Sequence, residues 1–185
     1  MSIWYAASEA VPLVKTGGLA DVAGALTQAW GQLGHRVRLL LPLYRQIDLH
    51  PNSVHSVQTL NFDLGGIRYS ALVKNLPTRR GLTVSLIDMP WSFDRSGIYG
   101  QEGDYPDNPL RFAVWGRAIV ELARQETGVD VLGGNDWQCG ALMAYARSLL
   151  PHTLPVFCIH NLAYHGDAGL SLVPLLELER HSHYH

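Results

Sequence analysis

Short hydrophobic runs alternate with amphipathic segments along most of the chain. The run IWYAA at 3–7 predicts a buried strand, because strands covered on both faces read as continuous apolar stretches. From Leu19 to Leu33 the hydrophobic positions recur at helical spacing, and Gly34 follows where a glycine commonly ends a helix. RVRLLLP at 36–42 then predicts a second buried strand that ends at a proline. These segments predict a βαβ unit with two parallel strands.

The remainder of the chain continues this alternation after one predicted hairpin. Two strand-like segments, 53–64 and 67–76, flank Gly65 and Gly66, a pair typical of a hairpin turn. Further strands are expected at 82–90, 129–134 and 154–160, and helices at 108–125 and 137–150. The pattern predicts an α/β fold with a Rossmann-like, doubly wound, mostly parallel sheet and helices on both faces.

Two segments fall outside the alternation. The segment 91–108, WSFDRSGIYGQEGDYPDN, is polar and rich in glycine, and loops of this length are usually functional or disordered. Its aromatic residues favour an ordered surface. The segment 171–185 is expected to begin as a helix and to end without structure. His181, His183 and His185 alternate there as in a metal-binding run, although an expression remnant or frayed end is the more common cause.

Composition and charge narrow the classes of function. The 185 residues suit one domain with its own core, and the net charge of −2 argues against nucleic acid as a partner. No apolar run approaches the ~18 residues that a membrane span needs, and the first residues do not resemble a signal peptide. Cys139 and Cys158 are too few for a disulfide framework or a zinc site. We therefore expect a cytoplasmic protein with no membrane partner.

Candidate chemistry begins with the loop before the first helix. Gly17 and Gly18 allow close approach to the backbone, and the helix that follows offers unpaired N–H groups beside the positive charge of Lys15. The combination suits a phosphate or diphosphate. It matches neither the dinucleotide nor the P-loop glycine pattern, and a solvated lysine beside a flexible turn is the alternative.

Polar residues also follow two later strands. Asp136 comes after the strand at 129–134, either as a helix N-cap or as an acceptor for a substrate hydroxyl, with Trp137 as an apolar wall. His160 and Asn161 close the strand at 154–160, where a lone histidine is usually structural. Because the carboxyl ends of parallel strands meet at one edge, these groups and Lys15 predict a single small-molecule cleft with anion and polyol character.

A series of ordered motifs resembles one family. They are KTGGLADV at 15–22, GHRVRLLLPLY at 34–44, LIDMPWSFDRSGIYG at 86–100, DNPLRFAVWGRA at 107–118, NDWQ at 135–138 and IHNLAYHG at 159–166. Over residues 3–166 they resemble the N-terminal domain of bacterial glycogen synthases and plant starch synthases. The resemblance implies a GT-B glycosyltransferase that transfers glucose from ADP-glucose to the non-reducing end of an α-1,4-glucan with retention. The resemblance implies no cofactor and no metal, because basic side chains and N–H groups meet the diphosphate charge.

The resemblance also implies roles for residues of the first loop and helix. Lys15, Gly17 and Gly18 are expected to lie against the donor phosphates and the transferring glucose. Asp21 is expected to shape the cleft near the acceptor. No enzymic nucleophile is implied.

Further roles are implied for the later strand ends and the long loop. Asp136 is expected to bind a donor or acceptor sugar, and His160 to orient a hydroxyl and stabilise positive charge, with Asn161 in support. Lys15, Asp136 and His160 are thus the expected catalytic residues. Phe93 and Tyr99 are expected to stack on, or hydrogen-bond to, glucan rings.

The sequence departs from the family pattern in places. GGNDW stands where many bacterial members have histidines before the Asp-Trp pair, and His165 replaces a glutamine, which is expected to alter hydrogen bonding in that loop. Residues 167–185 do not resemble the family's continuation. We therefore expect an acceptor-side glycosyltransferase domain at 1–166, a truncated or expression-derived tail at 167–185, and no C-terminal donor domain.

Half a cleft does not position both substrates, so the chain alone is expected to be inactive. Apolar surface on the cleft face predicts self-association. Two other functions stay open: a glucan-binding module without chemistry, and a related retaining nucleotide-sugar glycosyltransferase of the sucrose or trehalose synthase type. The latter usually lacks the combination of KTGGLADV and HNLAY.

Overall fold

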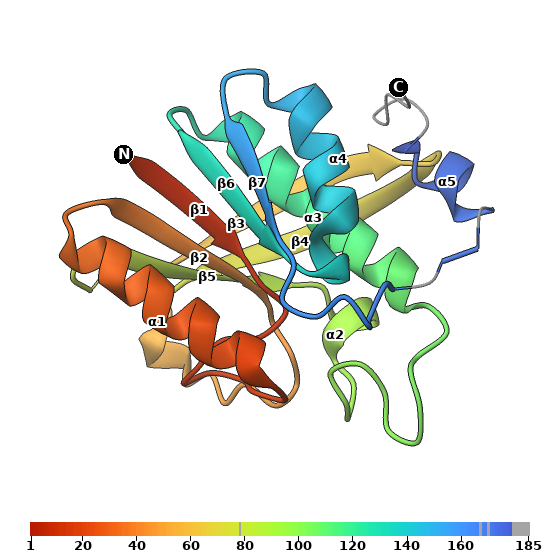
Figure 1. Cartoon of the computed structure of the whole chain (residues 1–185), viewed down its shortest axis with the longest axis horizontal. Helices are drawn as coiled ribbons and strands as arrows, with labels where there is room; N and C mark the ends of the chain where they lie inside the picture. Colours follow the sequence, from red (N-terminus) through yellow and green to blue (C-terminus); the bar gives the residue numbers. More distant parts are fainter. Residues whose placement is uncertain (78, 167, 170, 179–185) are drawn as a thin grey trace.

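The computed structural model describes residues 1–77, 79–166, 168–169 and 171–178. The described residues form one seven-stranded sheet in the order β3-β4-β5-β2-β1-β6-β7 (Figure 1). The strands are β1 (Ser2–Ala6), β2 (Arg36–Pro42), β3 (Ser56–Leu64), β4 (Ile67–Asn75), β5 (Leu82–Asp88), β6 (Val131–Asn135) and β7 (Leu154–Cys158). The helices are α1 (Gly18–Gln32), α2 (Pro90–Phe93), α3 (Asn108–Gln125), α4 (Gly140–Leu149) and α5 (Leu172–Leu175), with 3-10 turns η1 (Pro51–Ser53) and η2 (Trp137–Cys139).

Most of the sheet is parallel. β1 pairs in parallel with β2 and β6, β2 with β5, and β6 with β7. The predicted hairpin is confirmed at the other edge, where β3 and β4 are antiparallel and β4 joins β5. Its turn residues Gly65 and Gly66 have φ of 58° and 76°, which only glycine adopts without strain.

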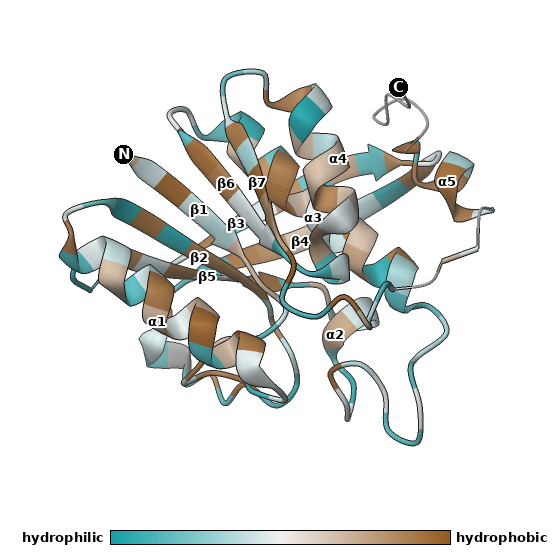
Figure 2. Ribbon diagram, in the orientation of Figure 1, coloured by the Kyte–Doolittle hydropathy of each residue, from teal (hydrophilic) through white to brown (hydrophobic). Residues whose placement is uncertain are grey.

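Helices cover both faces of the sheet, as the doubly wound prediction requires. α1 packs on β2 and β5, whereas α3 and α4 pack against each other on the opposite face (Figure 1). The two helices approach closely at Gly116, where a Cβ atom would lie 2.9 Å from that of Leu142. Figure 2 shows hydrophobic residues concentrated on the central strands, while the loop between α2 and α3 is mostly hydrophilic.

The direction of the chain reverses at β1. From β1 the chain moves through α1 to β2 on one side, and it returns through α3 to β6 on the other. Ligands of open α/β sheets bind outside the carboxyl ends of the strands at such a reversal. The residues that follow β1 and β6 therefore lie where a ligand site is expected.

The described end of the chain packs on the main body. Leu176 is buried, and its carbonyl accepts a hydrogen bond of 2.7 Å from the hydroxyl of Tyr145 on α4. The expected boundary at Gly166 stays a prediction. His181, His183 and His185 lie outside the described residues. No helix of the described chain is long and apolar enough to cross a membrane.

Candidate functional site

Asp136 turns the chain sharply at the end of β6. Its φ of 53° and ψ of −173° place a non-glycine residue in a region that costs on the order of 1–3 kcal/mol and is concentrated at functional sites. Its carboxylate makes no helix-cap hydrogen bond. Instead, Oδ1 accepts hydrogen bonds from the backbone N–H groups of His160, at 2.7 Å, and Asn161, at 3.4 Å. Asp136 thus stands at the N-cap position of η2 but does not cap it through its side chain, which joins the ends of β6 and β7 instead.

The side chain of Asn135 holds three strand ends together. Its Nδ2 donates to the carbonyl of Ala6 at 2.8 Å, so Oδ1 is the acceptor for the Tyr5 hydroxyl at 2.7 Å. The Nε2 atom of His160 lies 2.8 Å from the same oxygen and must donate to it. In the neutral ring Nδ1 then remains as an acceptor. Burial raises the pKa of Tyr5 to about 12, which keeps this hydroxyl a donor at ordinary pH.

The glycine loop before α1 is anchored by a buried carboxylate that sequence reasoning missed. Oε2 of Glu9 accepts hydrogen bonds from the backbone N–H groups of Thr16 and Gly17, the latter at 3.0 Å, and from the Thr16 hydroxyl at 2.9 Å. The N–H of Gly17, expected to face the donor phosphates, is therefore occupied within the protein. Gly18 begins α1, where N–H groups lack intrahelical partners.

Lys15 lies on the outer side of this loop. Its Nζ forms an ion pair of 2.7 Å with Asp21, and both side chains are at least half exposed. Exposed pairs of this kind contribute little to stability. The lysine is thus available to a ligand at the rim, and Asp21 sets its position.

A hollow of about 640 Å³, here called the strand-end hollow, gathers most of the expected residues. Its polar lining includes the carboxylates of Glu9, Asp104 and Asp136, and its apolar walls include Trp137 and Tyr164. Gly17, Gly18, Tyr99, His160 and Asn161 also line it. No lysine or arginine of the described chain does so. This chemistry suits a neutral polyhydroxylated ligand better than a diphosphate.

A second hollow of similar volume, here called the loop hollow, lies on the other side of Tyr99. Lys15 lines it together with residues of the segment 96–104, whereas Tyr99, Thr16 and Asp104 line both hollows. The Tyr99 hydroxyl lies 2.7 Å from the hydroxyl of Ser8, and burial raises the pKa of Tyr99 well above its usual range. Tyr99 is therefore a fixed wall between the hollows.

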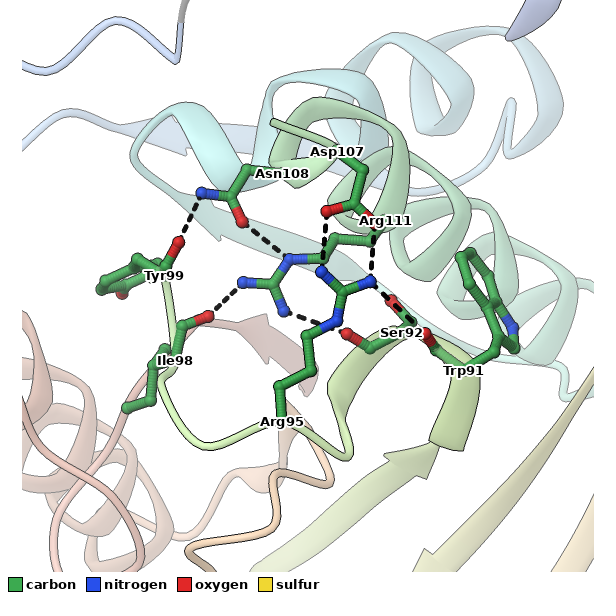
Figure 3. A network of polar contacts seen from close by, with 8 residues as sticks. All are labelled: Trp91, Ser92, Arg95, Ile98, Tyr99, Asp107, Asn108 and Arg111. Carbon is green, nitrogen blue, oxygen red and sulfur yellow. Dashed lines mark hydrogen bonds and ion pairs between the residues drawn. The ribbon is translucent and has the colours of Figure 1, made fainter. Parts of the chain in front are cut away.

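The buried guanidinium of Arg111 on α3 holds the loop that carries Tyr99 (Figure 3). It donates to the carbonyl of Ile98, to that of Ser92 at 3.2 Å, and to Oδ1 of Asn108 at 2.7 Å. Asn108 in turn donates to the carbonyl of Tyr99 at 2.8 Å. Thus the predicted order of the segment 91–108 is confirmed, and its cause is a charge buried beneath it.

Arg95 links the two ends of the same loop through Asp107. It forms two hydrogen bonds with the carboxylate of Asp107, at 2.7 and 2.6 Å, as Figure 3 shows. The guanidinium lowers the pKa of Asp107 through these bonds. Such paired contacts are among the stronger polar interactions in proteins.

One predicted site residue is wrong. Phe93 is fully buried and packs edge-on against Tyr44, with ring centroids 5.4 Å apart, so it offers no face to a sugar ring. A helical turn, α2, directs its side chain into the core. Glu9, Asn135 and Arg111 were missed, although an acidic residue between a buried strand and a glycine pair is a usable signal.

Among the described residues, Cys139 is not a reactive nucleophile and no metal centre is formed. Burial raises the pKa of the Cys139 thiol to about 12, which keeps it protonated and unreactive. Within the described residues, no three His, Cys, Asp or Glu side chains are grouped to hold a metal ion.

Comparison with known proteins identifies the family. The model of the starch synthase catalytic domain family matches residues 2–185. The chain belongs to this family. A glycogen synthase of Koribacter versatilis is 38% identical over 186 residues, covering 96% of this chain and 38% of that protein. A glycogen synthase of Paramagnetospirillum magneticum is 40% identical over 186 residues, covering 95% and 37%.

A solved member of the starch synthase family shares the fold. The catalytic domain of Arabidopsis thaliana starch synthase IV, bound to ADP and acarbose, superposes with a TM-score of 0.78 at 27% identity. The match covers 97% of this chain and 38% of that chain. The seven-stranded unit thus has the fold of part of a starch synthase catalytic domain, which is of the GT-B type, and it spans less than half the length of these relatives.

The Arg111 anchor predicts a loss of stability on substitution. Arg111→Leu leaves two buried carbonyls and the Asn108 amide oxygen without their donors, so we expect the free energy of unfolding in urea to fall by about 3 kcal/mol or more. Exchange of the Tyr105 amide, which donates to the carbonyl of Tyr99, should accelerate. Arg124→Leu on the same helix is the control, because the Arg124 side chain is half exposed and its loss should cost little. Equal losses in both variants would contradict the assignment.

Proposed function

We propose that this chain forms one wall of a glucosyltransferase cleft that transfers glucose from ADP-glucose to the non-reducing end of an α-1,4-glucan with retention. The strand-end hollow is the observation that carries the proposal, because it combines hydroxyl-binding groups with a glycine-rich loop at the sheet reversal. Family membership supports it. The solved relative that binds ADP and acarbose supports the same ligand classes.

The hollow is proposed to hold the reacting glucosyl units, which are the glucose being transferred and the non-reducing end of the glucan that accepts it. Carboxylate oxygens of Asp136 and the free Nδ1 of His160 accept hydrogen bonds from sugar hydroxyls, while Trp137 supplies an apolar wall. Asn135 orients the imidazole before any ligand arrives. Such preorganised dipoles act where charge develops in the transition state.

The diphosphate is proposed to lie outside the hollow, at the rim formed by Lys15 and Gly18. Three carboxylates line the hollow and oppose a phosphate there, whereas Lys15 and the start of α1 attract one. The rest of the longer relatives' chains is proposed to supply the remaining donor contacts. The absence of a metal requirement and a cytoplasmic location belong to the same proposal.

One wall of a cleft does not bring donor and acceptor together, and positioning supplies a large part of the rate. We therefore expect this chain alone to transfer no glucose from ADP-glucose to glycogen. The check is incorporation of labelled glucose, with a full-length glycogen synthase as the positive control. Incorporation above a heat-denatured sample would contradict this expectation.

Separate ligand titrations test the two proposed subsites. Asp136→Asn keeps an oxygen for the His160 N–H but removes the charge, so we expect it to weaken maltoheptaose binding about tenfold and leave ADP binding unchanged. Lys15→Ala should weaken ADP binding on the order of tenfold and spare maltoheptaose.

Isothermal calorimetry measures both affinities, with Arg68→Ala as the control because its exposed pair with Asp63 lies in the hairpin. Reversed effects of the two substitutions would refute the placement of the subsites. Binding of neither ligand by the unaltered chain would refute the proposed function of this wall.

Self-association is proposed to occur through β7, which is an edge of the sheet. Val156 and Phe157 are both exposed, and successive strand residues point to opposite faces. The average mass from light scattering should therefore rise with concentration. Phe157→Lys should reduce this rise, since lysine on an edge disfavours pairing, while Leu33→Lys on exposed surface should not. A constant monomer mass up to high concentration would disprove the proposal.

A further inference from the structure

The two carboxylate oxygens of Glu9 have different surroundings. The side chain is only 4% exposed, and Oε2 accepts all three of the hydrogen bonds from Thr16 and Gly17. Oε1 accepts none from the described residues. It borders the open side of Gly17, where a Cβ atom would lie 3.6 Å from it. A nearly buried carboxylate thus keeps one acceptor unused.

The unused oxygen belongs to the wall of the strand-end hollow, since Glu9 lines that hollow. Leaving a buried polar atom without a partner costs free energy, so such atoms are normally matched by water or a ligand. Oε1 is not among the buried side-chain atoms that lack both a partner and contact with solvent. It is therefore accessible from the hollow rather than sealed in the core.

The charges around the hollow determine which kind of ligand group can donate a hydrogen bond to Oε1. Asp104 and Asp136 line the same space, and no lysine or arginine of the described residues does so. A phosphate at this corner meets several negative charges and no positive one. A metal ion is not favoured either, because the described acidic residues are not grouped as ligands. A neutral donor, such as a sugar hydroxyl, satisfies Oε1 without these penalties.

We propose that Glu9 is a sugar-binding residue, whose Oε1 accepts a hydrogen bond from a hydroxyl of a glucosyl unit held in the hollow while Oε2 fixes the glycine loop. This inference rests on the proposed function and adds a binding group to its sugar subsite. The same carboxylate keeps the diphosphate out of the hollow, toward Lys15. One side chain thereby sets the shape of the loop and separates the two halves of a nucleotide-sugar ligand.

The substitution Glu9→Gln separates these two roles. The amide oxygen replaces Oε2 and keeps the three hydrogen bonds to the loop, which leaves an NH₂ group facing the hollow. The group that faces the hollow therefore changes from a hydrogen-bond acceptor to a donor, while the loop stays anchored. Glu9→Ala removes both functions. Glu102→Gln, on an exposed part of the long loop, controls for the loss of one negative charge.

Amide exchange and calorimetry on the intact chain test the two roles of Glu9. Amide exchange at Thr16 and Gly17 should remain close to that of the unaltered chain in Glu9→Gln and accelerate in Glu9→Ala. Calorimetry should show maltoheptaose binding weakened about tenfold or more by Glu9→Gln, which is the usual effect of losing a hydrogen bond to a charged group. ADP binding should stay unchanged or become tighter, and Glu102→Gln should leave both affinities unchanged.

Each other result would overturn the inference. Unaltered maltoheptaose affinity in Glu9→Gln with normal exchange would show that Oε1 does not contact the sugar, and the proposed function would survive. Weakened ADP binding in the same variant would place Glu9 at the phosphates. Equally fast amide exchange at Thr16 and Gly17 in both Glu9 variants would show that Glu9 has only a structural role. Failure of the unaltered chain to bind maltoheptaose would instead remove the proposed function and this inference together.

Discussion

The side-chain amide of Asn135 is the contact on which the arrangement of the strand ends depends. It is fully buried and connects β6 to the Ala6 carbonyl, the Tyr5 hydroxyl and the His160 ring. Hydrogen bonds are stronger in such a low-dielectric setting, and unmatched groups are more costly. The network therefore favours a single register among β1, β6 and β7. Asp136 and His160 face a common hollow because of it.

Buried charges fix the loops around that hollow. Glu9 anchors the glycine loop from below, and Arg111 anchors the loop of Tyr99 from the opposite side. Neither makes an ion pair with an oppositely charged side chain in the described structure, and both instead form hydrogen bonds with backbone groups and neutral side chains. Each guarantees a defined loop shape at the cost of desolvating a charge. Such rigidity is useful where a ligand must be positioned rather than merely bound.

The sequence was most informative where structure depends on local pattern. Hydrophobic runs predicted the parallel strands, and Gly65-Gly66 predicted the hairpin, because backbone sterics and burial on both faces decide these elements. The clustering of Gly18, Asp136 and His160 followed from the rule that carboxyl ends of parallel strands share one edge.

The sequence did not predict which way side chains point in irregular segments. Phe93 follows a strand in a polar loop and looks exposed, yet the turn of α2 rotates it into the core. Glu9 was overlooked because its importance depends on N–H groups that turn back toward it several residues later. Arg111 resembles an ordinary helix residue, and only packing of the loop over α3 shows it as the anchor.

The central position of β1 also has a kinetic consequence. Ile3 pairs with Val37 on one side and with Val131 on the other, so the middle of the sheet joins segments that are far apart along the chain. Closing such long loops loses chain entropy before native contacts compensate for it, and contact order of this kind slows folding. During synthesis, the edge of β1 that pairs with β6 remains unpaired until residues 131–135 have been made. Until then the unpaired N–H and C=O groups on that edge of β1 are open to pairing with other strands.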